Sequence, residues 1–73
     1  DVGNLNRVLK IAELRIQNEP TNAQKYLELA AVYLQLKRKT DAISAIRKAI
    51  ELEPSFKEEG ERFISDIEAG RAQ

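Results

Sequence analysis

Two prolines that stand 34 residues apart, Pro20 and Pro54, divide this chain into segments of similar pattern. The phrases that they close read RIQNEP (residues 15–20) and AIELEP (residues 49–54). A period of this length is typical of arrays in which each repeat is a helix, a turn and a second, antiparallel helix. The interval therefore predicts a helical repeat architecture, and such an architecture favours binding over catalysis.

Apolar residues recur at three- and four-residue steps in four stretches, as expected for helices with one buried face. We predict helices over residues 5–18, 23–36, 41–52 and 56–69. Gly70 is expected to end the last helix, and Gly60 to weaken it by about 1 kcal/mol relative to alanine. Because the connections are short, successive helices must pack antiparallel. The predicted fold class is all-α, an antiparallel helix-turn-helix array in a single domain spanning residues 1–73.

Polar residues that commonly cap helices precede three of these stretches. Thr21 or Asn22 is expected to cap the second helix, and Thr40 the third. Ser55 and Glu58 have the spacing of a capping box, in which each side chain bonds to the other residue's backbone N–H. We therefore expect this box to open the fourth helix.

Composition narrows the classes of function. The 73 residues include 12 basic and 12 acidic side chains, so no overall field favours nucleic acid or an anionic membrane. There is no cysteine and no histidine, the residues that most often supply nucleophiles, proton shuttles and metal ligands. The carboxylates Glu58, Glu59, Asp66 and Glu68 lack surroundings that would separate two pKa values. We expect no enzyme activity, no catalytic residue, no cofactor and no metal.

The compartment and the parent sequence stay open at this point. No apolar run reaches the roughly 20 residues that span a bilayer, so no membrane insertion is expected. The chain begins at Asp1 and contains no methionine. These features indicate a processed product or an excised piece of a longer protein, and we favour the excised piece, in which case any targeting segment lies outside it.

The segment 23–54 resembles a tetratricopeptide repeat. The family's pattern of large, small and proline positions is matched by Tyr26, Leu29, Ala30, Tyr33, Ala42, Ile46, Ala49 and Pro54. Small residues at Ala30 and Ala42 would let the two helices approach, while larger neighbours fill the surrounding space. The turn departs from the family, because Lys37-Arg38-Lys39 stands where glycine is usual. The resemblance implies a half repeat over residues 1–20, one full repeat over 21–54 and a capping helix over 55–73.

Both flanking segments match the repeat less well. One period before Ala42, Ile46 and Ala49, the chain has Val8, Ala12 and Arg15. One period after Tyr26, Leu29, Ala30 and Tyr33, it has Gly60, Phe63, Ile64 and Ile67. The last helix is therefore interpreted as the terminal cap that such arrays need.

In the resembled family, ligands lie along the first helix of each repeat. The corresponding positions form the predicted partner-binding groove: Gln24, Leu27, Glu28, Ala31, Leu34 and Gln35. Leu27 and Ala31 stand where family members that clamp a carboxylate have lysine and asparagine, so an acidic-tail clamp is rejected. The groove is mostly apolar and suits a peptide or helix of a partner protein. Alternatively, the first helix, a neighbouring repeat or a second protomer covers it.

Two charged regions have a functional and a simpler interpretation. The last helix could extend the groove with an acidic rim for a basic partner, or it is merely solvated: Glu58, Glu61, Arg62, Ser65 and Glu68. The basic turn Lys37-Arg38-Lys39, joined by Arg47 and Lys48, could bind phosphate or is a solvated turn. We favour the solvated interpretation of both, so nucleic acid is not an expected partner.

A structural role is the main alternative to ligand binding. The domain could form homo-oligomers, or dock onto the rest of its parent protein. A more specific version of this structural role rests on two short segments, Pro54-Ser55-Phe56-Lys57 and Phe63-Ile64. They resemble the ends of repeat tails on O-antigen-ligase-type membrane proteins of bacteria. That resemblance implies a soluble C-terminal tail.

Overall fold

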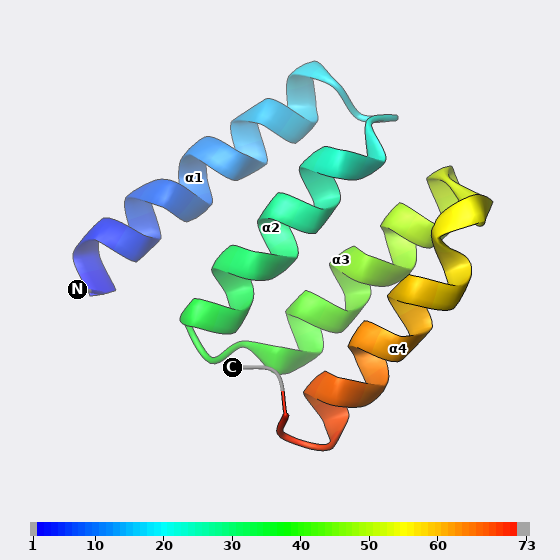
Figure 1. Ribbon diagram of the computed structural model, residues 1–73. Helices are drawn as coiled ribbons and strands as arrows, with labels where there is room; N and C mark the ends of the chain where they lie inside the picture. The colour runs from blue at the N-terminus through cyan, green and yellow to red at the C-terminus, as the bar shows by residue number, and fades with distance from the viewer. Residues whose placement is uncertain (1, 72–73) are drawn as a thin grey trace.

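The computed structural model describes residues 2–71, and within them the fold is all-α. It consists of α1 (Val2–Asn18), α2 (Ala23–Gln35), α3 (Lys39–Leu52) and α4 (Lys57–Glu68), with a single turn of 3₁₀ helix, η1 (Pro54–Phe56), before α4. The helices run antiparallel to their neighbours (Figure 1). The predicted antiparallel helical array is confirmed, although α1 begins three residues before the predicted start.

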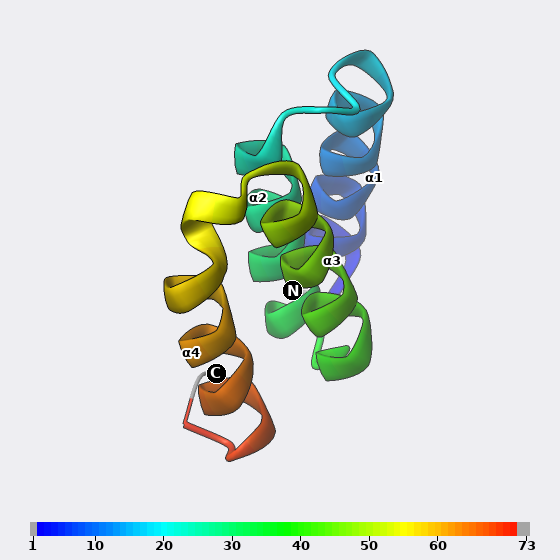
Figure 2. The ribbon, with the colours of Figure 1, turned by 90° about the vertical axis from the view of Figure 1, so that its right-hand side faces the viewer.

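The helices pack in chain order: α1 contacts α2, α2 contacts α3, and α3 contacts α4. Figure 2 shows that α2 and α4 are displaced to one side of the array, and α1 and α3 to the other. The domain is accordingly thin, with extents of 33 × 30 × 13 Å. Among the described residues, no helix combines the length and the apolar character needed to cross a bilayer.

Small residues lie where α2 and α3 meet. Ala30 of α2 and Ala42 of α3 are fully buried, together with Ile46. A side chain that ends at Cβ lets two helix backbones approach, and Ile46 fills the remaining space. Tyr33 lies at the edge of this contact: it is only partly buried and has the Arg38 guanidinium 4.8 Å from its ring centre.

Asn22, not Thr21, caps α2. Its side-chain oxygen accepts a hydrogen bond from the Gln24 backbone N–H at 3.0 Å, and its amide nitrogen donates to the Glu19 carboxylate at 3.1 Å. The second bond joins the end of the preceding segment to the cap. Asn22 therefore fixes both the start of α2 and the direction in which the chain enters it.

The other two predicted caps are wrong. Thr40 lies inside the first turn of α3, which begins at Lys39, and the preceding Arg38 donates to the Asp41 carboxylate at 2.8 Å. That ion pair and the favourable position of Asp41 near the helix N-terminus replace a hydroxyl cap. Ser55 lies inside η1, because Pro54 has the fixed φ that suits a first helical position. No side-chain cap opens α4.

The turn between α2 and α3 contains a left-handed residue that is not glycine. Lys37 has φ 62°. The turn is closed by backbone hydrogen bonds from Lys37 to Leu34 at 3.0 Å and from Arg38 to Tyr33 at 2.8 Å. A left-handed conformation costs an ordinary residue about 1 to 2 kcal/mol, so this turn is strained where glycine would not be.

We predict that Lys37→Gly raises the free energy of unfolding by about 0.5 to 1 kcal/mol, because relief of strain exceeds the added unfolded-state entropy of glycine. Urea denaturation followed by circular dichroism measures the change. Lys37→Ala is the matched control, since it removes the charge but keeps the strain. Equal gains in the two variants would show that charge, and not backbone conformation, limits this turn.

Gly60 allows the close approach of α4 to α3. It is buried, and a Cβ atom there would lie 2.7 Å from Ile50 Cδ1, 2.8 Å from Ile50 Cγ1 and 3.0 Å from Phe56 Cε2. The expected helix-propensity cost of Gly60 is not tested by this contact, but the missing side chain has a second effect, since it makes room for Ile50. Gly70 behaves as predicted: it follows α4 with φ 78°.

Gly60→Ala is expected to lower the free energy of unfolding by about 1 kcal/mol, because an overpacking cost of about 1 to 3 kcal/mol outweighs the better helix propensity of alanine. Ser65→Ala, on the exposed side of the same helix, should instead raise it slightly. Denaturation curves of both variants test this difference. A stabilising Gly60→Ala would contradict the packing described for α3 and α4.

Candidate interaction surface

A hollow of about 390 Å³ lies between the start of α2 and the start of α4. The backbones of these two helices do not approach within 8 Å at any Cα pair, so α3 holds them apart. We call this feature the α2–α4 hollow. It is lined by Asn22, Ala23, Gln24, Leu27, Glu53, Ser55, Phe56 and Glu59.

Three local features place the walls of the α2–α4 hollow. The Asn22 cap sets the first turn of α2, which carries Gln24 and, on the next turn, Leu27. The η1 turn brings Phe56 back against the core, where it is partly buried. Gly60 then lets α4 continue alongside Ile50. The hollow is thus a consequence of how the chain turns at Pro54 as well as of α2.

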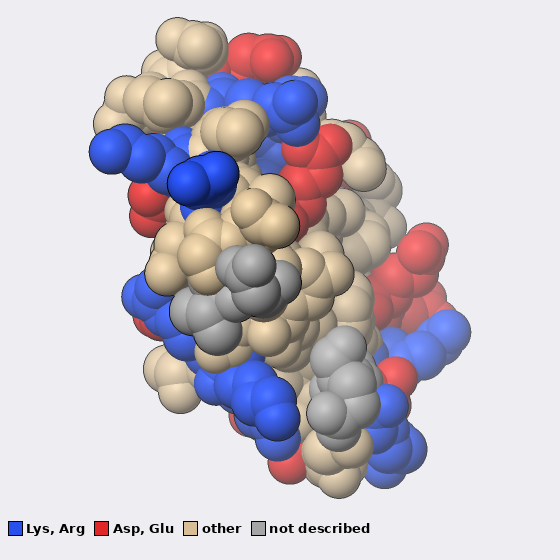
Figure 3. Space-filling model, turned by 90° about the vertical axis from the view of Figure 1, so that its left-hand side faces the viewer, with Lys and Arg blue, Asp and Glu red and all other residues tan. Residues whose placement is uncertain are grey.

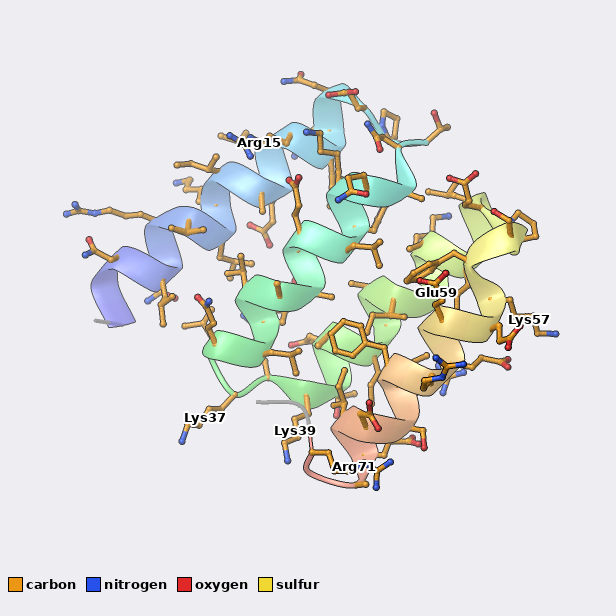
Figure 4. The ribbon with its side chains drawn as sticks, viewed as in Figure 1. Arg15, Lys37, Lys39, Lys57, Glu59 and Arg71 are labelled. Carbon is orange, nitrogen blue, oxygen red and sulfur yellow. The ribbon has the colours of Figure 1, made fainter. Side chains whose placement is uncertain are left out.

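The α2–α4 hollow combines apolar side chains with negative charge. Leu27, Phe56 and Ala23 supply apolar surface, while Glu53 and Glu59 are exposed and form no ion pair with a described residue. No lysine or arginine is among the lining residues. Figure 4 shows Glu59 on the inner side of α4, whereas Lys57 extends away from the molecule. This environment favours a group that is apolar with a positive end.

The six predicted groove residues do not all face the same space. Gln24 and Leu27 line the α2–α4 hollow. Glu28 instead faces α1, where its Oε1 lies 3.6 Å from Arg15 Nη1. On the later turns of α2, Ala31 and Gln35 are exposed, and Leu34 is half-buried against the core.

Six lining residues were not predicted from the sequence: Asn22, Ala23, Glu53, Ser55, Phe56 and Glu59. Because Ser55 and Glu58 were interpreted as a capping box, the 3₁₀ turn that places Phe56 in the wall of the α2–α4 hollow was not predicted. The available signal was the four-residue spacing of Phe56 and Gly60, which places them on one face of a helical stretch. In the structure, Phe56 Cε2 would lie 3.0 Å from a Cβ at Gly60.

The two charged regions lie outside the α2–α4 hollow. The residues of the suggested acidic rim, Glu58, Glu61, Arg62, Ser65 and Glu68, are all exposed, and none lines the hollow. Within that rim, Arg62 and Glu58 form an ion pair at 3.8 Å. Lys37 and Lys39 point away from the body of the molecule at the end opposite to the hollow (Figure 4). Between them, Arg38 is paired with Asp41.

No group of three or more histidine, cysteine, aspartate or glutamate side chains in residues 2–71 is arranged to hold a metal ion.

Comparison of the chain with known proteins identifies no related protein. No protein-family model matches the chain, and no match is found among curated proteins or among solved structures.

Proposed function

We propose that this domain is a non-enzymatic protein-interaction module of the tetratricopeptide type, which binds a peptide or helix of a partner along α2 and in the α2–α4 hollow. The observation that carries the proposal is the hollow itself, in which Leu27 and Phe56 lie among mostly polar residues that include the unpaired carboxylates of Glu53 and Glu59. The 34-residue interval and the antiparallel helical array support the choice of repeat type.

The α2–α4 hollow suits one anchoring side chain and a short length of backbone. Its volume of about 390 Å³ lies near the lower end of the range for ligand sites. An apolar stem would contact Leu27 and Phe56, and a lysine or arginine head group would face Glu53 and Glu59. Polar side chains at the rim, among them Gln24 and Ser55, can hydrogen-bond to the backbone of an extended segment.

The exposed part of α2 would hold the rest of the ligand. Ala31 and Gln35 continue the same helix beyond the α2–α4 hollow and carry no bulky side chain that obstructs an approaching segment. Because the anchor site is small, most of the affinity must come from a few well-buried contacts, as at other peptide-binding surfaces.

Peptides selected from a random display library against the isotope-labelled domain are expected to pair a basic residue with an apolar one. Their addition should shift the NMR signals of Gln24, Leu27 and Glu59 before those of α1. Selected peptides that shift only other residues, or a failure to select any peptide, would contradict the proposal. Sedimentation of the free domain separates this outcome from self-association, which would bury the same residues without a ligand.

The charge of the α2–α4 hollow gives a sharper prediction. Glu59→Gln should weaken a selected basic peptide about two- to fivefold, the range expected for an exposed ion pair worth up to about 1 kcal/mol. Lys57→Gln, on the same turn but directed away, is the matched control and should leave affinity unchanged. Isothermal titration at two salt concentrations measures both. Equal effects of the two variants would mean that net charge, and not the hollow, attracts the peptide.

A further inference from the structure

Three large aliphatic side chains are exposed along the outer face of α1. Val8 is 45% exposed, and Ile11 and Leu14 are each 51% exposed. Successive members are three residues apart, so they form one stripe on the helix surface. The adjoining face of α1, which includes Leu9 and Ala12, is buried against the core. We call the exposed set the α1 stripe.

The α1 stripe has a counterpart one 34-residue interval later in the chain. Val8 and Ile11 correspond to Ala42 and Ala45 of α3, which are buried where α3 meets α2. The larger side chains on α1 would hold a neighbouring helix farther away than α2 lies from α3. A helix that packs on the α1 stripe would therefore sit differently from the way α2 packs on α3.

Positive charge borders the α1 stripe. Arg7 and Lys10 lie one helical turn before Ile11 and Leu14, and Arg15 lies one turn after Ile11. Neither Arg7 nor Lys10 forms an ion pair with a described residue.

α1 has a single acidic side chain, Glu13, which follows Lys10 by three residues. The helical period places Glu13 on the side of the helix away from Ile11, so it does not face the centre of the stripe. Figure 3 views the molecule from the side where α1 lies, and blue basic groups there adjoin uncharged tan surface.

We infer that the α1 stripe docks an amphipathic helix with acidic flanks from a partner protein. An apolar stripe on such a helix would cover Val8, Ile11 and Leu14, and its carboxylates would face Arg7 and Lys10. Charge complementarity of this kind selects the partner and sets the register. This surface shares no residue with the α2–α4 hollow, so the inference does not depend on the function proposed for that hollow.

Charge also argues against a second copy as the occupant. Two α1 stripes facing each other would bring Arg7 and Lys10 of both copies to one interface without a compensating carboxylate. In a second copy, α4 does carry acidic residues, but its exposed apolar surface is the single side chain Phe63, 36% exposed, which is too small to cover the three residues of the stripe. An anionic membrane fits less well, since surface helices that bind lipid usually present aromatic residues, and the stripe is purely aliphatic.

Two synthetic peptides test the inference. Both are helical and carry the same leucine stripe, but one is flanked by glutamate and the other by lysine. Fluorescence anisotropy should show the acidic peptide binding to the domain about tenfold more tightly than the basic one, with a loss of affinity as salt rises. The double variant Arg7→Glu, Lys10→Glu should reverse this preference, and Ile11→Gln should weaken the acidic peptide at least fivefold.

A matched control removes the effect of net charge. Glu13→Lys makes α1 more positive on the side away from the stripe, so affinity for the acidic peptide should change less than twofold. Circular dichroism confirms that each variant is folded, which is expected because the substituted side chains are exposed.

Four results would overturn the inference. They are equal binding of the two peptides, binding of neither, self-association that Ile11→Gln abolishes, and Ile11-dependent binding to vesicles of phosphatidylglycerol and phosphatidylcholine. The third would assign the stripe to a second copy of the chain, and the fourth to a lipid surface.

Discussion

The contact between α2 and α3 determines the arrangement of the other helices. Ala30 and Ala42 are fully buried there, so the two backbones approach as closely as alanine allows. α1 then packs on the free side of α2, and α4 on the free side of α3. Because α3 separates α2 from α4, the space between those two helices remains open at one end as the α2–α4 hollow. A larger residue at either alanine would therefore move the α2 wall of the hollow relative to the wall that follows α3.

Helical periodicity was sufficient to predict the four helices, and turn chemistry was not. The apolar spacing records which face of each helix is buried, and this information is local. The start of α3 depends on an ion pair between Arg38 and Asp41, and the start of α4 on the 3₁₀ turn at Pro54. The role of Gly60 could not be predicted from local sequence either. It depends on the contact with Ile50, which exists only in the folded chain.

The surface around α2 could be predicted only in part, for a related reason. The position of Gln24 and Leu27 follows from the helix to which they belong. The opposite wall comes from Phe56 and Glu59, whose placement depends on how the chain turns after α3. Glu28 was assigned to the groove by its sequence position, and the structure adds that its carboxylate lies 3.6 Å from Arg15 of α1, at the edge of that face. Sequence position identifies a helix face, and neighbouring helices decide which part of that face stays accessible.

The two ends of the array differ in how much apolar surface they leave exposed. In α4, Ile64 and Ile67 are buried, most outward residues are charged, and Phe63 is the one large apolar side chain exposed there, against three on α1. In α1, Arg15 replaces the alanine that α3 has one interval later, and it pairs with Glu28 of α2. If another helix packed closely against this end, it would bury the Arg15 guanidinium. The free energy lost by removing that charge from water would exceed the small stabilisation that its exposed ion pair with Glu28 provides. An open apolar edge that disfavours another regular repeat fits a binding surface better than a site of polymerisation.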